Sequence, residues 1–312
     1  MASSYLKRIE TLTRILLDPD NPAYSLRPEV LEIVDILQTL ATGFDRKSDI
    51  TADETRTAQG LAISPTMAAM CSDEYLRTIQ YLRGFDAAIR DSAEVNGERV
   101  VRALYVGTGP LATLAVPLMV IRPAKSVVFE MIDIHETSTR SVAAILESLG
   151  LSDRVVAIHC CDAMNYEPDP DTPPDVVMAE IMLAGLENEP QVAVTRCLAR
   201  KLPDAVFLPE SIEVGIIADT DDAVAQPAFV FDRTMREVSG NDSHTLPAYE
   251  VTIPNDGPVF LDTRICIYGP HSLERNQSSL TTRRILPFAH TPGETIRLAY
   301  RMGEYPGLIR TD

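Results

Sequence analysis

The sequence predicts an α/β chain in three parts. An N-terminal helical cap (1–95) precedes a central, doubly wound parallel sheet (96–210), and a C-terminal antiparallel β region (211–312) completes the chain. Three successive patterns of apolar residues along the sequence indicate these parts. Apolar residues recur first at helical spacing, then in strand-like runs that alternate with helical ones, and last in strand-like runs separated by turn residues. Strands that alternate with helices favour a parallel sheet covered on both faces.

The helical cap is predicted from apolar residues that recur every three or four positions up to about Arg90, so that each helix would bury one face. Pro19, Pro22 and Pro28 divide this run into separate helices, because proline lacks the amide proton that a helix interior needs. The periodic residues include Leu6, Ile9, Leu12, Ile15, Leu16, Val30, Ile33, Val34, Ile36, Leu37 and Leu40.

The central sheet is predicted from short apolar runs of strand length with helical runs between them. The predicted strands are 100–106, 126–132, 155–159, 176–179 and 205–208, and the predicted helices are 111–120, 137–149 and 190–200. From Ser211 onward the helical period is lost, and apolar runs alternate with Pro, Gly and Asn-Asp turns, as is typical of antiparallel sheets.

Composition excludes some classes of partner. The chain has 312 residues with 28 Lys and Arg against 45 Asp and Glu, and its formal net charge of −17 argues against binding to nucleic acid or to an anionic membrane. The sequence shows neither a long apolar run nor a secretory signal, so a cytoplasmic protein is expected. The five cysteines and five histidines lack the spacing of a metal site, and no metal is expected.

The most specific local motif is a glycine turn. Residues 104–111 (LYVGTGPL) have the pattern of a strand that passes through G-x-G into a helix. Glycines at such a turn let the backbone approach a ligand without a Cβ in the way, and the start of the helix offers unpaired N–H groups. Gly107 and Gly109 are therefore candidate ligand-binding residues.

Acids follow the glycine turn near the ends of the next two predicted strands. Glu130 and Asp133 lie about twenty residues after the turn, where an acid can accept both hydroxyls of a ribose. The length of the strand decides between them, and a long strand favours Asp133. Asp162 follows the third strand, where an acid suits an adenine amino group or, alternatively, caps a turn.

The glycine turn, the strand-end acid and Asp162-Ala163 together resemble the class I S-adenosylmethionine-dependent methyltransferases, which have a Rossmann-like fold. Position 112 is Ala where a nicotinamide-binding turn has its third glycine. Residues 70–81 (MCSDEYLRTIQY) are similar to the helix that precedes the sheet in the protein arginine methyltransferases of this class. The resemblance implies S-adenosylmethionine as the cofactor and places Arg77 on its methionine carboxylate.

A second similarity to the arginine methyltransferases follows the fourth predicted strand. The family's loop there begins S-E-W-M-G and carries a second glutamate nine positions after the first, and Glu180 and Glu189 have this spacing. Residues 200–210 resemble the family's strand that ends in F-P-D/E. The resemblance implies that Glu180 and Glu189 are catalytic. Glu187 competes for the second position, and an acidic helix start without catalytic function is the alternative.

Two glutamates suit a guanidinium acceptor for a physical reason. A guanidinium is planar, charged near neutral pH and carries five N–H donors in a fixed fork, so two carboxylates can hold it and direct one nitrogen at the sulfonium methyl group. A carboxylate can also accept the proton that the nitrogen loses during methylation.

The chain departs from that family in its C-terminal region. The family contributes a T-H-W loop to the site, whereas this chain has no Trp. Residues 243–245 (SHT) are a candidate remnant, but we favour a solvated loop for His244. The region leaves little room for the helical arm through which that family dimerises, so the sequence does not decide whether the chain forms a homodimer. We expect the additional N-terminal helices to enclose a small pocket for a free guanidino or amino metabolite such as L-arginine. Arg264, Arg283 or Arg284 would bind its carboxylate.

Two alternatives keep the same fold. The glycine turn and residues 129–133 (FEMID) also resemble the nicotianamine synthases, which implies transfer of the aminocarboxypropyl group of S-adenosylmethionine, or its closure to a ring, with release of methylthioadenosine. The other alternative is a non-catalytic regulatory protein that binds the cofactor. We favour an S-adenosylmethionine-dependent N-methyltransferase acting on a small molecule.

Overall fold

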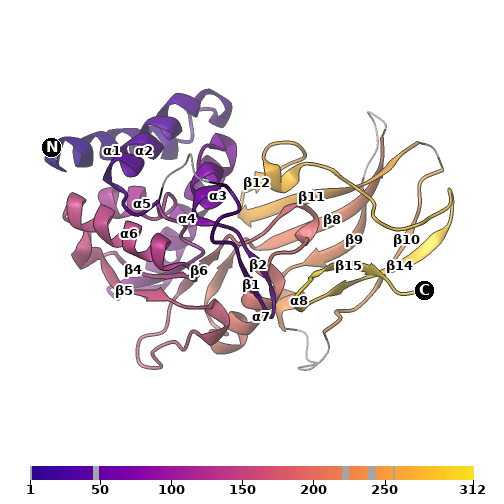
Figure 1. The fold of residues 1–312 in the computed structure, drawn as a ribbon. Helices are drawn as coiled ribbons and strands as arrows, with labels where there is room; N and C mark the ends of the chain where they lie inside the picture. The colour runs from indigo at the N-terminus through magenta and orange to yellow at the C-terminus, as the bar shows by residue number, and fades with distance from the viewer. Residues whose placement is uncertain (1, 45–48, 220–224, 238–243, 256) are drawn as a thin grey trace.

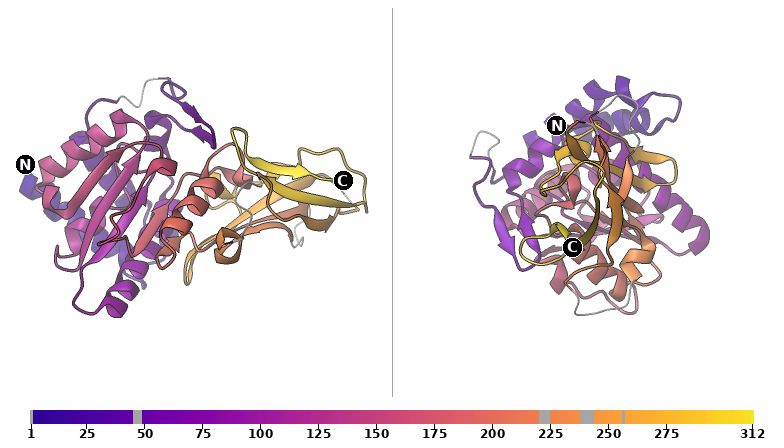
Figure 2. Two further views of the ribbon diagram at one scale, coloured as in Figure 1. Left: turned by 90° about the horizontal axis from the view of Figure 1, so that it is seen from below. Right: turned by 90° about the vertical axis from the view of Figure 1, so that its right-hand side faces the viewer.

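The chain folds into two lobes that lie side by side (Figure 1). The computed structural model describes residues 2–44, 49–219, 225–237, 244–255 and 257–312. One lobe contains the N-terminal helices and a parallel sheet, and the other contains antiparallel strands, as the left view in Figure 2 shows. The predicted fold class is therefore confirmed. Within the described ranges, no helix is long and apolar enough to cross a lipid bilayer.

Helices precede the sheet, as the apolar period predicts. They are α1 (Ala2–Leu17), α2 (Arg27–Leu40), α3 (Pro65–Cys71) and α4 (Tyr75–Asn96), with a short 3₁₀ turn, η1 (Ala23–Ser25), between the first two. Pro28 lies in the first turn of α2, where its missing N–H has no partner to lose. The buried faces of α1 and α2, including Ile9, Leu12 and Val34, belong to the core of the first lobe.

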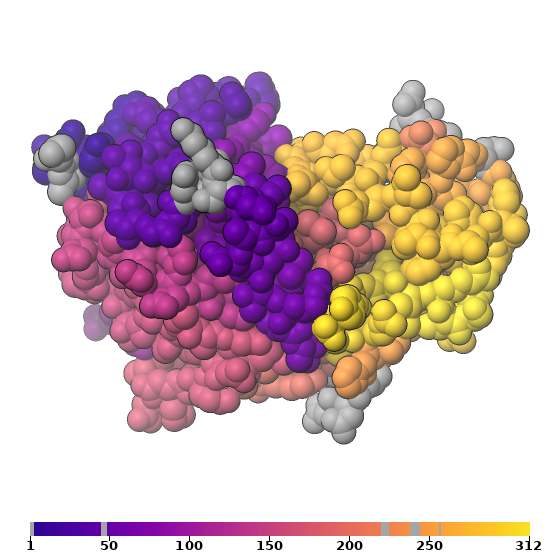
Figure 3. Space-filling model, viewed as in Figure 1, coloured from indigo at the N-terminus to yellow at the C-terminus, as the bar shows by residue number. Residues whose placement is uncertain are grey.

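The helical prediction is wrong between α2 and α3, where the chain forms a β-hairpin. β1 (Thr55–Thr57) and β2 (Gly60–Ala62) pair antiparallel, and Gly60 has a φ of +139°. The hairpin crosses toward the second lobe, where Arg56 donates to the Glu304 carbonyl oxygen and lies over the Tyr305 ring. In Figure 3 the segment drawn in purple meets the yellow C-terminal segment at this place.

The parallel sheet has the strand order β5–β4–β3–β6–β7. Its strands are β3 (Val101–Val106), β4 (Val127–Asp133), β5 (Val155–Cys160), β6 (Val176–Ala179) and β7 (Val206–Leu208), and the helices between them are α5 (Val116–Ile121), α6 (Glu136–Leu149) and α7 (Gln191–Lys201). Short 3₁₀ turns are η2 (Ser152–Arg154), η3 (Ala163–Asn165) and η4 (Ala184–Leu186). α5 starts at Val116, well after the predicted start at Leu111, because the chain first makes turns in which Ala112 has a φ of +44°.

Helices cover both faces of this sheet. On one face Leu104, Val106 and Val177 pack with Val194 and Leu198 of α7. On the other face the core contains strand residues such as Tyr105 and Phe129 together with side chains of α4, α5 and α6, and α1 and α2 extend this core outward. The sheet is therefore doubly wound, as predicted.

The second lobe contains two antiparallel sheets. Its strands are β8 (Ser211–Ala218), β9 (Gln226–Phe231), β10 (Tyr249–Thr252), β11 (Val259–Tyr268), β12 (His271–Leu273), β13 (Arg284–Ile285), β14 (Thr295–Arg301) and β15 (Gly307–Arg310), with α8 (Arg233–Glu237) and the 3₁₀ turn η5 (Ser279–Thr281) between strands. One sheet has the order β12–β11–β8–β9 with β13 on β11, and the other has the order β10–β14–β15. Phe229 and Tyr300 stack between the two sheets with their ring centroids 5.0 Å apart.

The register of the parallel sheet aligns three loops of interest. Val106 pairs with Ile132 on one side and with Ala179 on the other. The next residue on each strand is Gly107, Asp133 or Glu180, so these three residues leave three adjacent strands in a row. The carboxyl edge of a parallel sheet is where ligands of such folds bind.

Candidate functional site

A cavity of about 470 Å³ lies at this edge of the sheet. Residues of the β1–β2 hairpin, α3, α4, the strand-end loops and η5 line it, so both lobes contribute to it. Its acidic and basic lining side chains are Glu74, Arg77, Asp133, His135, Asp162, Glu180 and Glu189. The cavity thus contains every site residue expected from the sequence except Glu130, with Gly107 and Gly109 also in its wall.

The glycine turn has left-handed backbone at both glycines, with φ of +77° at Gly107 and +57° at Gly109. A Cβ added at Gly107 would lie 2.3 Å from Ile181 Cγ2 and 3.2 Å from the Glu180 carbonyl oxygen. A Cβ at Gly109 would lie 3.2 Å from Ala68 Cβ of α3. The glycines therefore also let the Glu180 loop and α3 approach the turn closely, which the sequence did not indicate.

The structure favours Asp133 over Glu130 for a ligand at this edge. Asp133 is buried in the cavity wall, and its carboxylate accepts hydrogen bonds from Gly109 N and His135 N, both at 2.9 Å. Glu130 lies three residues earlier, on the opposite face of β4, where its carboxylate pairs with His159 Nε2 at 2.7 Å. The alternative of Glu130 as a cavity ligand is therefore wrong.

Two polar atoms at the start of α6, one on its N-cap residue and one in its first turn, have no hydrogen-bond partner within the described chain. They are His135 Nε2 and Ser138 Oγ; both are buried, and both residues line the cavity beside Asp133. Buried polar atoms are normally hydrogen-bonded, so these two atoms indicate a polar ligand at this place. Nothing in the sequence pattern distinguished them from ordinary helix residues.

Asp162 caps a turn and also lies in the wall of the cavity. Its Oδ1 accepts from Met164 N at 2.9 Å and so caps η3, while the residue also lines the cavity. The second carboxylate oxygen has no hydrogen bond to a described residue and is available to a donor.

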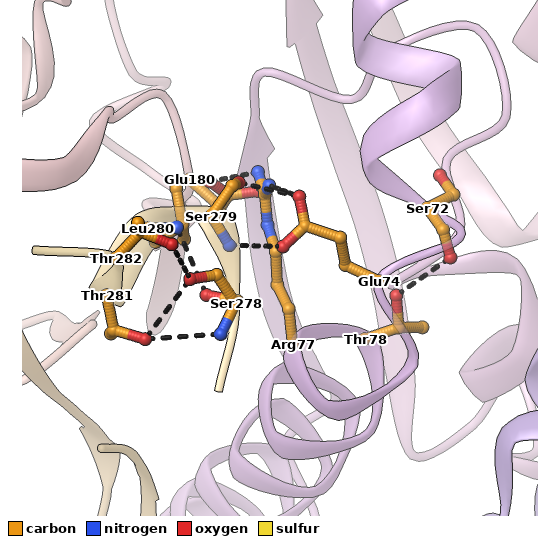
Figure 4. Close-up of polar contacts among 10 residues, drawn as sticks. All are labelled: Ser72, Glu74, Arg77, Thr78, Glu180, Ser278, Ser279, Leu280, Thr281 and Thr282. Carbon is orange, nitrogen blue, oxygen red and sulfur yellow. Dashed lines mark hydrogen bonds and ion pairs between the residues drawn. The ribbon is translucent and has the colours of Figure 1, made fainter. Parts of the chain in front are cut away.

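Arg77, on the first turn of α4, lies between two glutamates (Figure 4). Its Nη2 is 2.6 Å from each carboxylate oxygen of Glu180, and its Nη1 is 3.5 Å from Glu74. Burial raises the pKa of Glu180, and the Arg77 guanidinium opposes that rise. The same carboxylate keeps the guanidinium charged in spite of its burial, because it raises the pKa of Arg77.

Glu74 joins this cluster to the second lobe. Its carboxylate accepts from Ser279 N at 2.7 Å and from Ser279 Oγ at 2.6 Å (Figure 4). Ser279 lies in η5, whose start is fixed by a capping box between Ser278 and Thr281. Glu74 is part of the segment that resembles the arginine methyltransferases, whereas no sequence signal pointed to Ser279.

Glu189 is a buried carboxyl group with no hydrogen-bond partner in the described part of the chain. It is 5% exposed, it lines the cavity, and no hydrogen bond joins its carboxyl to a described residue. Burial, and then the nearby Glu180 carboxylate, raises its pKa from 4.5 to about 8. Glu187, the competing candidate, lies outside the cavity wall and pairs with Arg284 at 3.3 Å. The structure therefore favours Glu189 over Glu187.

The loop between these glutamates is held from several sides. The Gln191 side chain accepts from Ile181 N and donates to the Ala179 carbonyl oxygen, which ties the start of the loop to α7. The second lobe holds the loop through a hydrogen bond from Tyr300 to the Leu186 carbonyl oxygen. From the hairpin, Leu61 N donates to the Asn188 carbonyl oxygen at 2.6 Å. These hydrogen bonds hold the loop in a conformation with positive φ at Leu186 and Asn188, which is unfavourable for residues other than glycine.

His244 is exposed and absent from the cavity wall, as expected for a histidine of a solvated loop, and Ser243 lies outside the described residues. The second lobe reaches the cavity through Ser279 and Leu280 instead. The expectation that the additional N-terminal helices enclose the pocket is wrong for α1 and α2. The cavity is covered by the hairpin and α3 and not by α1 and α2, which pack on the far side of α4 and α6. The hairpin covers the cavity because it reaches from the first lobe to the second, whereas α1 and α2 pack on helices of the first lobe.

The three arginines expected to bind an acceptor carboxylate do not line the cavity either. Arg264 pairs with Glu274, Arg283 with Asp219 and Arg284 with Glu187. Each therefore already has a carboxylate partner on the second lobe or at its border.

Comparison with known proteins gives a likeness of structure alone. No protein-family model matches the chain, and no curated protein matches it. Among solved structures, the Trypanosoma brucei PRMT1 enzyme–prozyme heterotetrameric complex with AdoHcy is similar over 74% of this chain and 86% of that one, with 14% identity and a TM-score of 0.51.

Two further structures give weaker likenesses. PRMT6 has 11% identity over 74% of this chain and 96% of its own, with a TM-score of 0.49. Arabidopsis thaliana protein arginine methyltransferase 10 has 10% identity over 70% of this chain and 84% of its own, with a TM-score of 0.44. The assignment rests on the first likeness: the chain has the Rossmann-like methyltransferase fold of the Trypanosoma brucei PRMT1 complex, with a parallel sheet followed by antiparallel strands.

Proposed function

We propose that the protein is an enzyme that transfers the methyl group of S-adenosylmethionine to a nitrogen of a small guanidino or amino compound. One observation carries this proposal: Glu180 and Glu189 lie in the same buried cavity as Arg77, the glycine turn and Asp133, at the carboxyl edge of the sheet. The fold shared with a PRMT1 complex that contains AdoHcy supports it.

The residues present fit the cofactor. Asp133 and the unpartnered His135 Nε2 and Ser138 Oγ would bind the ribose, and Asp162 would accept from the adenine amino group. Arg77 would bind the methionine carboxylate. When bound there, S-adenosylmethionine supplies an electrophilic methyl group.

Glu189 is suited to hold the acceptor and to take its proton. With a pKa of about 8 it is mostly protonated at neutral pH in the free protein. A guanidinium or ammonium ion beside it lowers that pKa, so Glu189 ionises and binds the cation through charge-assisted hydrogen bonds. The acceptor nitrogen gains a methyl group and loses a proton, and the Glu189 carboxylate is placed to accept that proton.

Glu180 has a different role in this proposal from Glu189. Both its oxygens already bind Arg77, so it orients the guanidinium that would hold the cofactor, while its negative charge favours a cation in the cavity. We therefore expect Glu180 variants to weaken cofactor binding as well as turnover, and Glu189 variants to affect the acceptor alone.

The test is the identity of the nucleoside product. We expect the protein to convert S-adenosylmethionine to S-adenosylhomocysteine in the presence of a panel of guanidines and amines, with one methylated acceptor formed for each nucleoside. Methylthioadenosine as the product would contradict the proposal and favour aminocarboxypropyl transfer or ring closure. Binding of the cofactor without any turnover across the panel would favour a regulatory protein.

A further inference from the structure

The cavity carries a strong excess of negative charge. Five carboxyl groups line it, those of Glu74, Asp133, Asp162, Glu180 and Glu189. Among the described residues, Arg77 is the single Lys or Arg side chain in the same wall. In a cavity with low dielectric such charges act strongly on a ligand, so they decide the charge that the ligand must have.

Arg77 has no donor left for a carboxylate of the acceptor once the cofactor is bound. Its side chain is 8% exposed, its Nη2 is bound to both oxygens of Glu180, and its Nη1 faces Glu74. Under the proposed function, its remaining N–H groups bind the methionine carboxylate of the cofactor. Within the part of the chain that the structure describes, a carboxylate on the acceptor would therefore lie near several carboxyl groups and have no cation of its own, which is costly in a buried site.

Apolar side chains also line the cavity. They include Leu61 from the hairpin, Ile63 just after it, Met182 and Leu183 from the Glu180 loop, and Leu280 from η5. These side chains come from three separate segments of the chain. A hydrocarbon stem can pack against them, whereas an ionised amino-acid head cannot.

We infer that the acceptor is an organic cation without a carboxylate, whose guanidinium or ammonium groups are carried on a hydrocarbon stem. This inference rests on the proposed function and narrows its substrate class, because it excludes free L-arginine and other amino acids as good acceptors. Glu189 binds the cationic group, and the apolar segments of the hairpin, the Glu180 loop and η5 pack against the stem.

The experiment compares three guanidines that differ at one end. Agmatine is arginine without its carboxylate, and L-arginine methyl ester is arginine with the carboxylate neutralised. Calorimetry on the protein loaded with S-adenosylhomocysteine should give a Kd for agmatine at least about tenfold lower than for L-arginine, with the ester binding better than L-arginine. The Glu189→Gln variant should lose most of its agmatine affinity, while Glu187→Gln, which changes a glutamate outside the cavity, should keep it.

The outcomes separate this inference from the proposed function. L-Arginine binding as tightly as agmatine, or no binding of any of the three guanidines, would overturn the inference. Methylation of L-arginine at the rate of agmatine would also overturn it and leave the methyltransferase proposal intact. Tight binding of agmatine without release of S-adenosylhomocysteine from S-adenosylmethionine would support the inference and contradict the methyl transfer.

Discussion

At the scale of single residues, the site depends on two glutamates with opposite surroundings. Glu180 is neutralised by Arg77 at 2.6 Å, whereas Glu189 is buried without a partner and has a pKa raised to about 8. Their spacing in the sequence predicted that they would lie near one cavity. It gave no means to distinguish them, because the difference comes from Arg77, which is 103 residues away from Glu180 in the sequence.

Binding of a cationic acceptor should release a proton from Glu189. Because the pKa of Glu189 is about 8 in the free protein, we expect about one proton released per cation at pH 6 and about half a proton at pH 8. Calorimetry in buffers of different ionisation enthalpy measures this number. Proton release that stays near zero at pH 6, or that persists in Glu189→Gln, would contradict the role given to Glu189.

The same pKa predicts a loss of stability at high pH. The folded protein holds the Glu189 proton more tightly than the unfolded chain, so this contribution to stability is fully present below about pH 4.5 and is lost as the pH rises through about 8. The Glu189→Gln variant has no carboxyl group at this position, so it does not lose this stability at high pH. Relative to the wild type, its free energy of unfolding in denaturant should rise from pH 5 to pH 9, whereas that of Glu187→Gln should stay flat. A flat profile for both variants would mean that Glu189 is solvated.

Loss of Arg77 should weaken the binding of the cofactor and also disturb the position of Glu180. A charge-assisted bidentate contact typically contributes about 1.5–3 kcal/mol, so Arg77→Ala should bind S-adenosylmethionine about ten- to a hundredfold more weakly, and Arg77→Lys should recover part of the affinity. Adenosine, which lacks the methionine carboxylate, is the control ligand. An equal loss of adenosine affinity would show that Arg77 acts only on the structure.

At the scale of elements, the strands and helices of the sheet were predictable, and the parts that enclose the cavity were not. The predicted strands match because each buried strand is a short apolar run with turns at its ends, and the position of Asp133 follows from the length of β4. The β1–β2 hairpin has strands of three residues, too short to show a period. The contact between Glu74 and Ser279 joins residues 205 positions apart, which no local pattern records.

The glycine turn and the Glu180 loop should behave as one unit. A Cβ at Gly107 would lie 2.3 Å from Ile181 Cγ2, so a side chain there would disturb the Glu180 loop as well as a ligand. We expect Gly107→Ala to lower the melting temperature and to impair cofactor and acceptor binding together, because the φ of +77° and the packing both oppose a Cβ. The double variant with Ile181→Ala should recover part of the stability. No recovery would show that the backbone conformation alone is responsible.

At the scale of the whole molecule, the cavity is built where two lobes meet. The first lobe supplies the glycine turn, the strand-end acids and Arg77, and the second supplies η5 and the hydrogen bond of Tyr300 that supports the Glu189 loop. The hairpin fastens the seam through Arg56 and Leu61. The domain boundaries drawn from the sequence stay predictions.

The cover over the cavity supports the small acceptor that we propose. The hairpin, α3 and η5 cover the carboxyl edge of the sheet, and they leave a cavity of about 470 Å³ lined by both lobes. A segment of a folded protein would have to displace this cover, whereas a compact cation on a hydrocarbon stem would not.

The most direct test of the central claim is the turnover of two matched variants, with S-adenosylmethionine and agmatine as substrates. Glu189→Gln and Glu187→Gln make the same chemical change two positions apart, inside and outside the cavity. We expect Glu189→Gln to lower turnover by at least about a hundredfold, or roughly 2.7 kcal/mol in the barrier, with cofactor affinity unchanged, and Glu187→Gln to stay near wild type. Near-normal methyl transfer by Glu189→Gln, or a greater loss in Glu187→Gln, would contradict the account.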